Sequence, residues 1–237
     1  LTNFIRRAFR RSVTPELVGR YAKNVQSQIA NGGSFVQSMK NVVSAVLCSP
    51  RFLYLYDRPI NEVRDDFNLA SRLSFFLWGS IPDEELLELA ESRMLREPKV
   101  LAAQVDRMLR DKRLKRFCDS FPAQWMQLER IISSKPDQNL FPMFYSNAYR
   151  LSMHMMLEPL LLFETVLVED MPVFQLIDSD FSYRSKSLSE WYETGDRKGD
   201  LPTTTLTFKR ELLADRREGG VITNAAVMTM TSNPTRS

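Results

Sequence analysis

The sequence predicts a mainly α fold, with two consecutive helical bundles followed by an irregular C-terminal segment that contains a short strand. Glycine is scarce, at 8 of 237 residues, while 11 Met and 15 Phe are spread along the chain. Leu, Met and Phe suit helix interiors and the interfaces between helices. Apolar residues also recur at helical spacing, between clear start and stop signals for helices. A hydrophobic content of 43% supplies ample material for a core.

Residues 1–58 predict a small three-helix domain. Its first helix is basic, with four arginines between positions 6 and 11. Thr14-Pro15-Glu16 predicts the start of the second helix, because Thr caps, Pro suits the first turn and an acid suits the helix dipole. Ser34 to Gln37 forms a capping box for the third helix, which Ser49-Pro50 is expected to end.

Residues 66–195 predict a larger helical domain, joined to the first by the polar stretch 57–65. Asp66 is expected to cap its first helix, and Pro82 and Pro98 to open the next two. A fourth helix is expected over 114–128. A long helix follows near 144–168, with a kink expected at Pro159, because proline removes a backbone donor and clashes with the preceding turn.

The C-terminal part carries weaker helical signals from Met171 onward. Residues 195–202 predict a loop, and the alternation over 203–212 predicts a short strand. Residues 217–237 are expected to be the truncated start of a third domain, with a turn at Gly219-Gly220 and a short apolar element over 221–230. Both ends of the chain look cut from a longer protein.

Composition narrows the classes of function. A net charge of +3 is too small to indicate nucleic-acid binding. No uninterrupted apolar run approaches the length of a membrane span, so no transmembrane segment is expected. Cys48 and Cys118 are expected to be buried, reduced thiols on helices, although a disulfide between them stays open in an oxidising compartment.

The sequence assigns no catalytic, cofactor-binding or metal-binding residue. His154 is the one histidine, which argues against zinc sites and catalytic triads, and it is expected on a surface or half-buried helix position. Met153, Met155 and Met156 are expected to pack in a core, with thioether ligation as the alternative. Gly219-Gly220 has no phosphate-loop context.

Carboxylates and cations gather in three places. Asp83, Glu84, Glu85 and Glu88 suit the start of a helix, and Asp178 and Asp180 suit Asx capping of a turn, with an acid pair for glycoside hydrolysis left open. Six cations lie at Arg107, Arg110, Lys112, Arg113, Lys115 and Arg116. They are expected to form a solvated helix face with partner acids, or else to bind an anionic polysaccharide or another subunit.

Several strings resemble a known family. They are RRAFRRSVTPELVGRY and NVVSAVLCSPRFLY, then LASRLSFFLWGSIPDEELLELA, VDRMLRDKRLKRFCDSFPAQWMQL and EPLLLFETVLVED, then LIDSDFSYRSKSLSEWY and REGGVITNAAVMTMTSNPTRS. Together they resemble multidomain proteins associated with planctomycete-type cytochrome c domains, in which the helical domains have no known function. Residues 186–189 and Pro159 depart from the expected family pattern.

The resemblance implies an exported protein, periplasmic or extracellular, with haem c in flanking domains and none bound by this chain. Two hypotheses follow. The chain is a helical scaffold of an extracytoplasmic c-type cytochrome that supports electron transfer or haem redox chemistry outside these residues. Alternatively, it is a non-catalytic module for protein–protein or surface assembly. A hydrolase is a third, weaker hypothesis, since it would need an acid pair meeting in a cleft.

Overall fold

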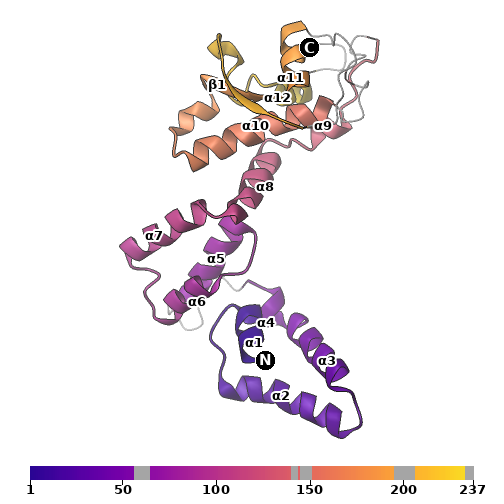
Figure 1. The fold of residues 1–237 in the computed structure, drawn as a ribbon, viewed down its shortest axis with the longest axis vertical. Helices are drawn as coiled ribbons and strands as arrows, with labels where there is room; N and C mark the ends of the chain where they lie inside the picture. Colours follow the sequence, from indigo (N-terminus) through magenta and orange to yellow (C-terminus); the bar gives the residue numbers. More distant parts are fainter. Residues whose placement is uncertain (56–64, 140–143, 145–150, 195–205, 233–237) are drawn as a thin grey trace. The chain divides into compact units, whose positions relative to one another are not determined.

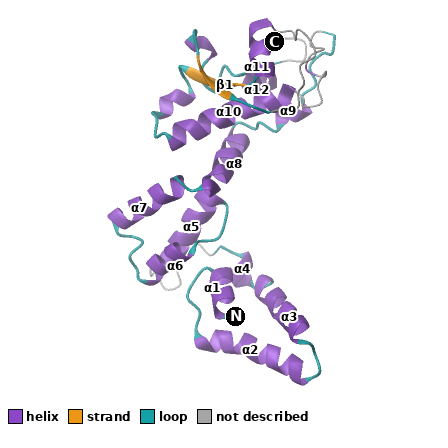
Figure 2. Ribbon diagram, viewed as in Figure 1, coloured by secondary structure: helices purple, strands orange, loops and turns teal. Residues whose placement is uncertain are grey.

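The computed structural model describes residues 1–55, 65–139, 144, 151–194 and 206–232, and these are mainly α, as predicted (Figure 1; Figure 2). The predicted joint at 57–65, apart from its last residue, lies outside the described residues. So do the first part of the predicted long helix, apart from Phe144, the predicted loop at 195–202 and the last five residues. The chain divides into two compact units, Leu1–Leu114 and Lys115–Ser237.

The first unit begins with α1 (Thr2–Phe9), α2 (Pro15–Ala30), α3 (Phe35–Leu47) and the short α4 (Pro50–Leu53). Both predicted caps are present. Thr14 Oγ1 accepts from the Leu17 amide at 3.3 Å, and Ser34 Oγ accepts from the Gln37 amide at 3.2 Å. The chain does leave α3 before Ser49-Pro50, but Pro50 then opens α4, because proline suits a first helical turn.

Arg10 links α1 to the segment around α4 by hydrogen bonds. It lies at the end of α1 with a positive φ of 56°, and its side chain is buried. Its guanidinium donates to the backbone carbonyls of Arg51, Phe52 and Tyr54 at 3.0 to 3.1 Å. The arginine thereby satisfies carbonyls that have no helical partner, which makes it part of the core of this domain.

The rest of the first unit contains α5 (Asp66–Trp78), α6 (Glu84–Glu91), α7 (Pro98–Leu109) and a 3-10 turn, η2 (Lys112–Leu114). The predicted cap of α5 is off by one residue. Asp65 accepts from the Phe67 amide at 2.9 Å, whereas Asp66 is buried and accepts from Arg96 Nε at 2.7 Å. The helix α7 begins at Pro98, as predicted.

The second unit is organised around α10 (Leu151–Val168). Packed against it are α8 (Lys115–Trp125), α9 (Arg130–Ser133), the 3-10 turn η4 (Val173–Leu176), β1 (Phe181–Arg184), α11 (Lys186–Thr194) and α12 (Ala225–Thr231) (Figure 1). The strand β1 pairs antiparallel with β2 (Lys209–Leu212), with Phe181 opposite Leu212. A further 3-10 turn, η5 (Arg216–Glu218), follows β2.

The C-terminal part is more regular than the sequence indicates. Helices α11 and α12 and strand β1 form in the part of the chain where the sequence predicts only weak helical structure. Their stability comes from packing on α10. Of the predicted strand at 203–212, residues 209–212 form β2, residues 206–208 lie outside it, and residues 203–205 lie outside the described part of the chain. The contact boundary falls after Leu114, and α12 packs on α10. The domain ranges expected from the sequence, 1–58, 66–195 and 217–237, stay a prediction.

The helix α10 is long and apolar enough to cross a membrane, judged by length and composition alone. The expectation that no segment spans a membrane rests on the lack of a long uninterrupted apolar run. Of this helix, 61% is buried inside the second unit, and its apolar side chains join two clusters of the core. Such burial is what a core helix requires.

Candidate functional site

The polar candidate site lies on the central helix α10. Among its mainly apolar side chains, four polar ones are buried, Ser152, His154, Glu158 and Thr165. Burying a polar group costs free energy unless another group hydrogen-bonds to it. The elements packed around α10 supply such partners for His154, Glu158 and Thr165.

Glu158 is the most enclosed carboxylate of the site, with 1% of its surface exposed. Ser182 on β1 donates to its Oε1 at 2.6 Å, and Tyr192 on α11 donates to its Oε2 at 2.8 Å. Burial raises the pKa of Glu158, although both hydrogen bonds and the charge of Arg184 act in the opposite direction. The net effect is that the proton of this carboxyl group is harder to remove than that of an exposed glutamic acid.

Tyr192 connects this carboxyl group to α12. Its hydroxyl donates to Glu158 and accepts from the Ala225 amide at 2.7 Å, in the first turn of α12. Burial, followed by the charge of Glu158, raises the pKa of Tyr192. Asn224 caps the same helix, where its Oδ1 accepts from the Val227 amide at 2.9 Å. Two side chains, Tyr192 of α11 and the cap residue Asn224, thus hold the start of α12.

Arg184 closes the site on its outer side. Its guanidinium lies 4.1 Å from the ring centroid of Tyr192, within the range of a cation–π contact, and donates to Glu218 at 2.6 Å. Only 10% of the Arg184 side chain is exposed. The arginine therefore screens Tyr192 from solvent and ties β1 to the turn η5.

His154 lies one helical turn before Glu158 and is buried, so the expectation of a surface or half-buried position was wrong. Its Nδ1 shares a hydrogen bond of 2.7 Å with Ser185 Oγ, and that hydroxyl also accepts from the Leu188 amide at 3.2 Å. Although a serine meets the histidine, both side chains are buried, so a substrate cannot reach the hydroxyl. The pair fixes the start of α11 on α10.

The remaining predicted groups take structural positions. Met155 is buried in the core, Met156 packs beside it, and Met153 is half-buried. At the turn between Asp178 and Asp180, the Ser179 hydroxyl donates to the Phe181 carbonyl and accepts from the Phe181 amide. Gly220 has a φ of 85°, and a Cβ there would lie 2.0 Å from the Ile177 carbonyl oxygen. A side chain at this position would clash with the backbone of Ile177, so this packed turn needs glycine here.

Both cysteines are free thiols in the structure, which answers the question of a disulfide between them. Cys118 is buried as expected, and burial raises its pKa to about 11. Cys48 is exposed, so the expectation of two buried thiols was wrong for this residue. In the part of the chain that the structure describes, no group of three His, Cys, Asp or Glu side chains is placed to hold a metal ion.

Four of the six cations in the basic segment 107–116 pair with acids of the described residues. Arg107 and Arg113 both bond Asp83, the cap of α6, and Arg113 also bonds Asp111 at 2.6 Å. The Arg113 guanidinium lies 3.4 Å from the ring centroid of buried Trp78. Lys115 bonds Asp119 and Glu164, and Arg110 bonds Asp106. The segment matches the expected helix face with partner acids.

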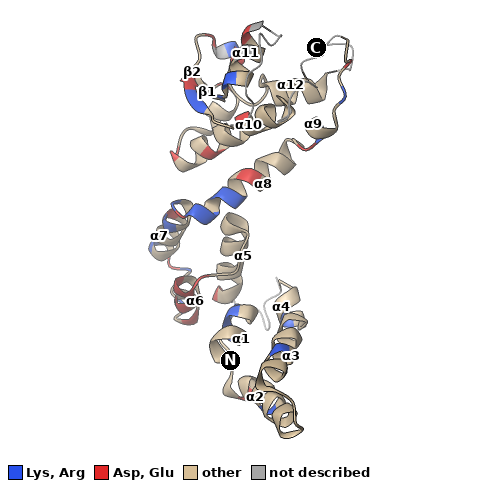
Figure 3. Cartoon of the chain, turned by 45° about the vertical axis from the view of Figure 1, so that its right-hand side comes forward, with Lys and Arg blue, Asp and Glu red and all other residues tan. Residues whose placement is uncertain are grey.

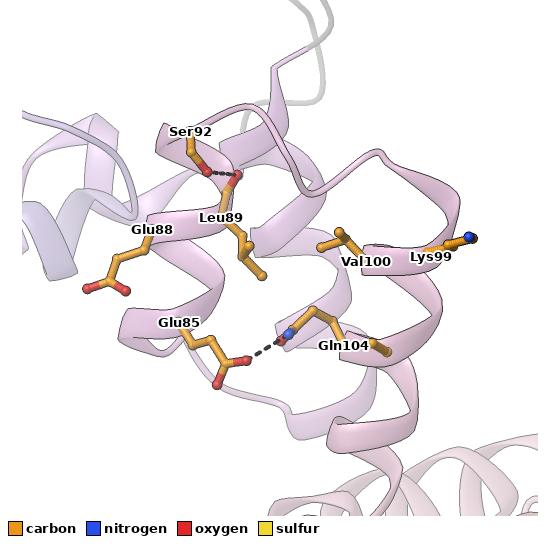
Figure 4. A pocket seen from close by; sticks show the side chains of 8 residues that line it. Glu85, Glu88, Leu89, Ser92, Lys99, Val100 and Gln104 are labelled. Carbon is orange, nitrogen blue, oxygen red and sulfur yellow. Dashed lines mark hydrogen bonds between the residues drawn. The ribbon is translucent and has the colours of Figure 1, made fainter.

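A hollow between α6 and α7 lies near these acids, with a volume of about 550 Å³ (Figure 4). Leu89 and Val100 point into it, and Gln104 donates to Glu85 at 2.7 Å across one end. Glu88 points away from the hollow in Figure 4. The hollow is open and has no convergent set of acid, base and nucleophile, so it lacks the features of an active site.

Comparison with known proteins gives two family matches. The family model of PSD5, a protein of unknown function (DUF1595), matches residues 1–57. The family model of PSD4, a protein of unknown function (DUF1592), matches residues 65–194. No curated protein matches the chain, and no solved structure matches it. Because the second match spans more than half of the 237 residues, the chain belongs to the PSD4 (DUF1592) family.

Proposed function

We propose that this chain is a non-catalytic helical scaffold within an extracytoplasmic multidomain protein whose other domains carry haem c and perform redox chemistry. The observation that carries the scaffold role is the enclosure of Glu158. Its carboxyl group accepts hydrogen bonds from Ser182 and Tyr192, and the Tyr192 hydroxyl accepts from the backbone of α12. These bonds hold three elements, β1, α11 and α12, on α10.

An active site would arrange the same groups differently. A catalytic acid or base has to reach its substrate, within hydrogen-bond distance or through one water. Here Glu158 and His154 are each 1% exposed, and their hydrogen-bond partners include Tyr192 and Ser185, which fix the starts of α12 and α11. The polar groups therefore support a rigid fold, which is what a domain that positions other domains needs.

The haem association rests on sequence resemblance. The strings that resemble proteins with planctomycete-type cytochrome c domains include residues 69–90 and 217–237. The first of these lies inside the PSD4 match. The chain itself contains no C-x-x-C-H motif, so covalent haem would have to be attached to other domains.

Haem staining of the full-length protein tests this association. We expect a band that keeps haem peroxidase activity in a denaturing gel, and a pyridine haemochrome spectrum of c type. The 237-residue chain, produced together with the cytochrome c maturation machinery, is the control and should stain negative. A full-length protein without covalent haem would contradict the haem association and leave the scaffold role to be tested by the substitutions described below.

Cell fractionation tests the proposed location. We expect the full-length protein in the periplasmic or extracellular fraction, with a cytoplasmic enzyme as the marker of lysis. Recovery together with that marker would contradict the extracytoplasmic location.

A further inference from the structure

The first 54 residues have an unusual charge balance. They contain eight Lys and Arg but a single acid, Glu16, whereas the whole chain has 32 cations and 29 acids. Figure 3 shows the contrast, with blue segments on α1 and α3 and a largely red α6. Since the chain as a whole is close to neutral, these residues hold a local excess of positive charge.

Three of the eight cations bond an acid or a backbone carbonyl within the first unit, and the guanidinium of a fourth, Arg51, lies 6.0 Å from the Phe9 ring centroid. Arg6 pairs with Glu84 and Glu91, Arg11 pairs with Asp65, and Arg10 bonds backbone carbonyls. The five apart from Arg6, Arg10 and Arg11 form no ion pair within the part of the chain that the structure describes; they are Arg7, Arg20, Lys23, Lys40 and Arg51.

Two of these cations, Arg20 and Arg51, line a groove between α2 and α3 with a volume of about 380 Å³. Its lining contains no carboxylate. Tyr21, Asn24 and Ser49 contribute neutral hydrogen-bonding groups to the same groove. Buried Leu17 and Val42 add apolar surface to the lining.

This lining defines the chemistry of a ligand. A guanidinium group presents a fork of donors that matches a carboxylate, and exposed arginines without acids leave that fork available. A volume of this size lies in the range of small-ligand sites. Tyrosine and apolar side chains suit the C–H face of a sugar ring, and the amide and hydroxyl groups suit its hydroxyls.

We propose that the groove between α2 and α3 binds an acidic saccharide, whose carboxylate is held by Arg20 and Arg51. A nucleic acid would require a longer stripe of cations that follows successive phosphates, and only two cations line this groove. The site is separate from the scaffold role, because none of its lining residues belongs to the network around α10.

Titration of the 237-residue chain with trigalacturonic acid tests the proposal, by chemical shift perturbation and calorimetry at 150 mM salt. Galactotriose is the neutral counterpart of this probe. We expect binding of the uronate that is at least 10-fold tighter than binding of the neutral trisaccharide. The double variant Arg20→Gln/Arg51→Gln should lose at least 10-fold in affinity for the uronate.

A matched double variant, Lys23→Gln/Lys40→Gln, removes the same charge from α2 and α3 but outside the groove lining. We expect its affinity to fall by less than 3-fold. Equal losses in the two double variants would overturn the proposal, because they would indicate general charge attraction. Equal binding of the two trisaccharides, no binding at millimolar uronate, or tighter binding of a thymidine oligonucleotide would also overturn it. Circular dichroism of each variant checks that the fold is intact.

Discussion

The network around Glu158 in the second unit and the groove between α2 and α3 in the first unit both gather polar side chains, and they use them in opposite ways. In the network, each charge or hydroxyl meets a partner from another element of the same unit. In the groove, two arginines face no acid. Charge therefore points to a ligand only where the chain itself does not neutralise it.

The largest effect is expected when the network is broken at its centre. Glu158→Ala leaves the Ser182 and Tyr192 hydroxyls without their acceptor and opens a cavity in the core. We expect a loss of about 3–5 kcal/mol in the free energy of unfolding. Urea denaturation measures this loss, and hydrogen exchange at the Ala225 amide should report earlier opening of α12.

Glu164→Ala is the matched control on the same helix. Glu164 is partly exposed and pairs with Lys115, so its loss should cost about 1 kcal/mol or less. If both substitutions cost the same, the network around Glu158 does not hold the second unit together.

The pH dependence of stability sharpens the contrast. Because burial raises the pKa of Glu158 above its ordinary 4.5, the folded chain keeps a proton there that the unfolded chain releases. The free energy of unfolding should therefore fall as the pH rises from about 4.5 through the raised pKa. Burial also raises the pKa of Tyr192, so this residue should lower the free energy of unfolding further as the pH rises above 10.

Comparison with Glu158→Gln isolates this contribution, because the amide does not titrate. Urea midpoints of both proteins should be measured between pH 4.5 and 8. We expect the advantage of the wild type over the variant to shrink as the pH rises. An advantage that grows with pH would mean that Glu158 is stabilised as a carboxylate.

A smaller effect is expected in the basic segment 107–116. Arg113 lies over the Trp78 ring and bonds two acids, and its hydrogen bonds lower the pKa of Asp111 to about 2. We expect Arg113→Ala to cost about 1–2 kcal/mol. Arg110→Ala removes an exposed pair with Asp106 and should cost less than about 0.5 kcal/mol. Equal costs would weaken the structural explanation of this segment and favour its role in binding a partner.

Local signals in the sequence predicted the helices well in the first unit. The caps Thr14 and Ser34 and the proline at Pro98 act within one helical turn, so their effect can be read from neighbouring residues. In the second unit, α11 and α12 are short helices of 9 and 7 residues, and such short helices need packing, here against α10, to be stable. Their existence therefore required contacts between residues far apart in the sequence.

The polar groups also differ in how far the sequence alone shows their partners. Glu158 interrupts an apolar helix, which is a signal that a partner must exist, but Ser182 and Tyr192 lie 24 and 34 residues away. The density of cations in the basic segment is visible in the sequence. Some of its acids are local, such as Asp111, but Asp83 and Glu164 lie far away along the chain. The lack of acids in residues 1–54 was visible in the sequence and would have indicated the groove.

The smallest effect on stability is expected at the groove itself. Arg20 and Arg51 are exposed, and neither forms an ion pair within the described residues. Their removal takes away like-charge repulsion, and the internal contact that it costs is that of the Arg51 guanidinium, 6.0 Å from the Phe9 ring centroid. Arg20→Gln/Arg51→Gln should therefore change the free energy of unfolding by no more than about 0.5 kcal/mol in either direction. Urea denaturation at 20 mM and 500 mM salt checks this, because salt screens repulsion and should erase any gain. A loss above about 1 kcal/mol would show that the arginines support the fold, whereas a stable variant that no longer binds the uronate would separate binding from folding.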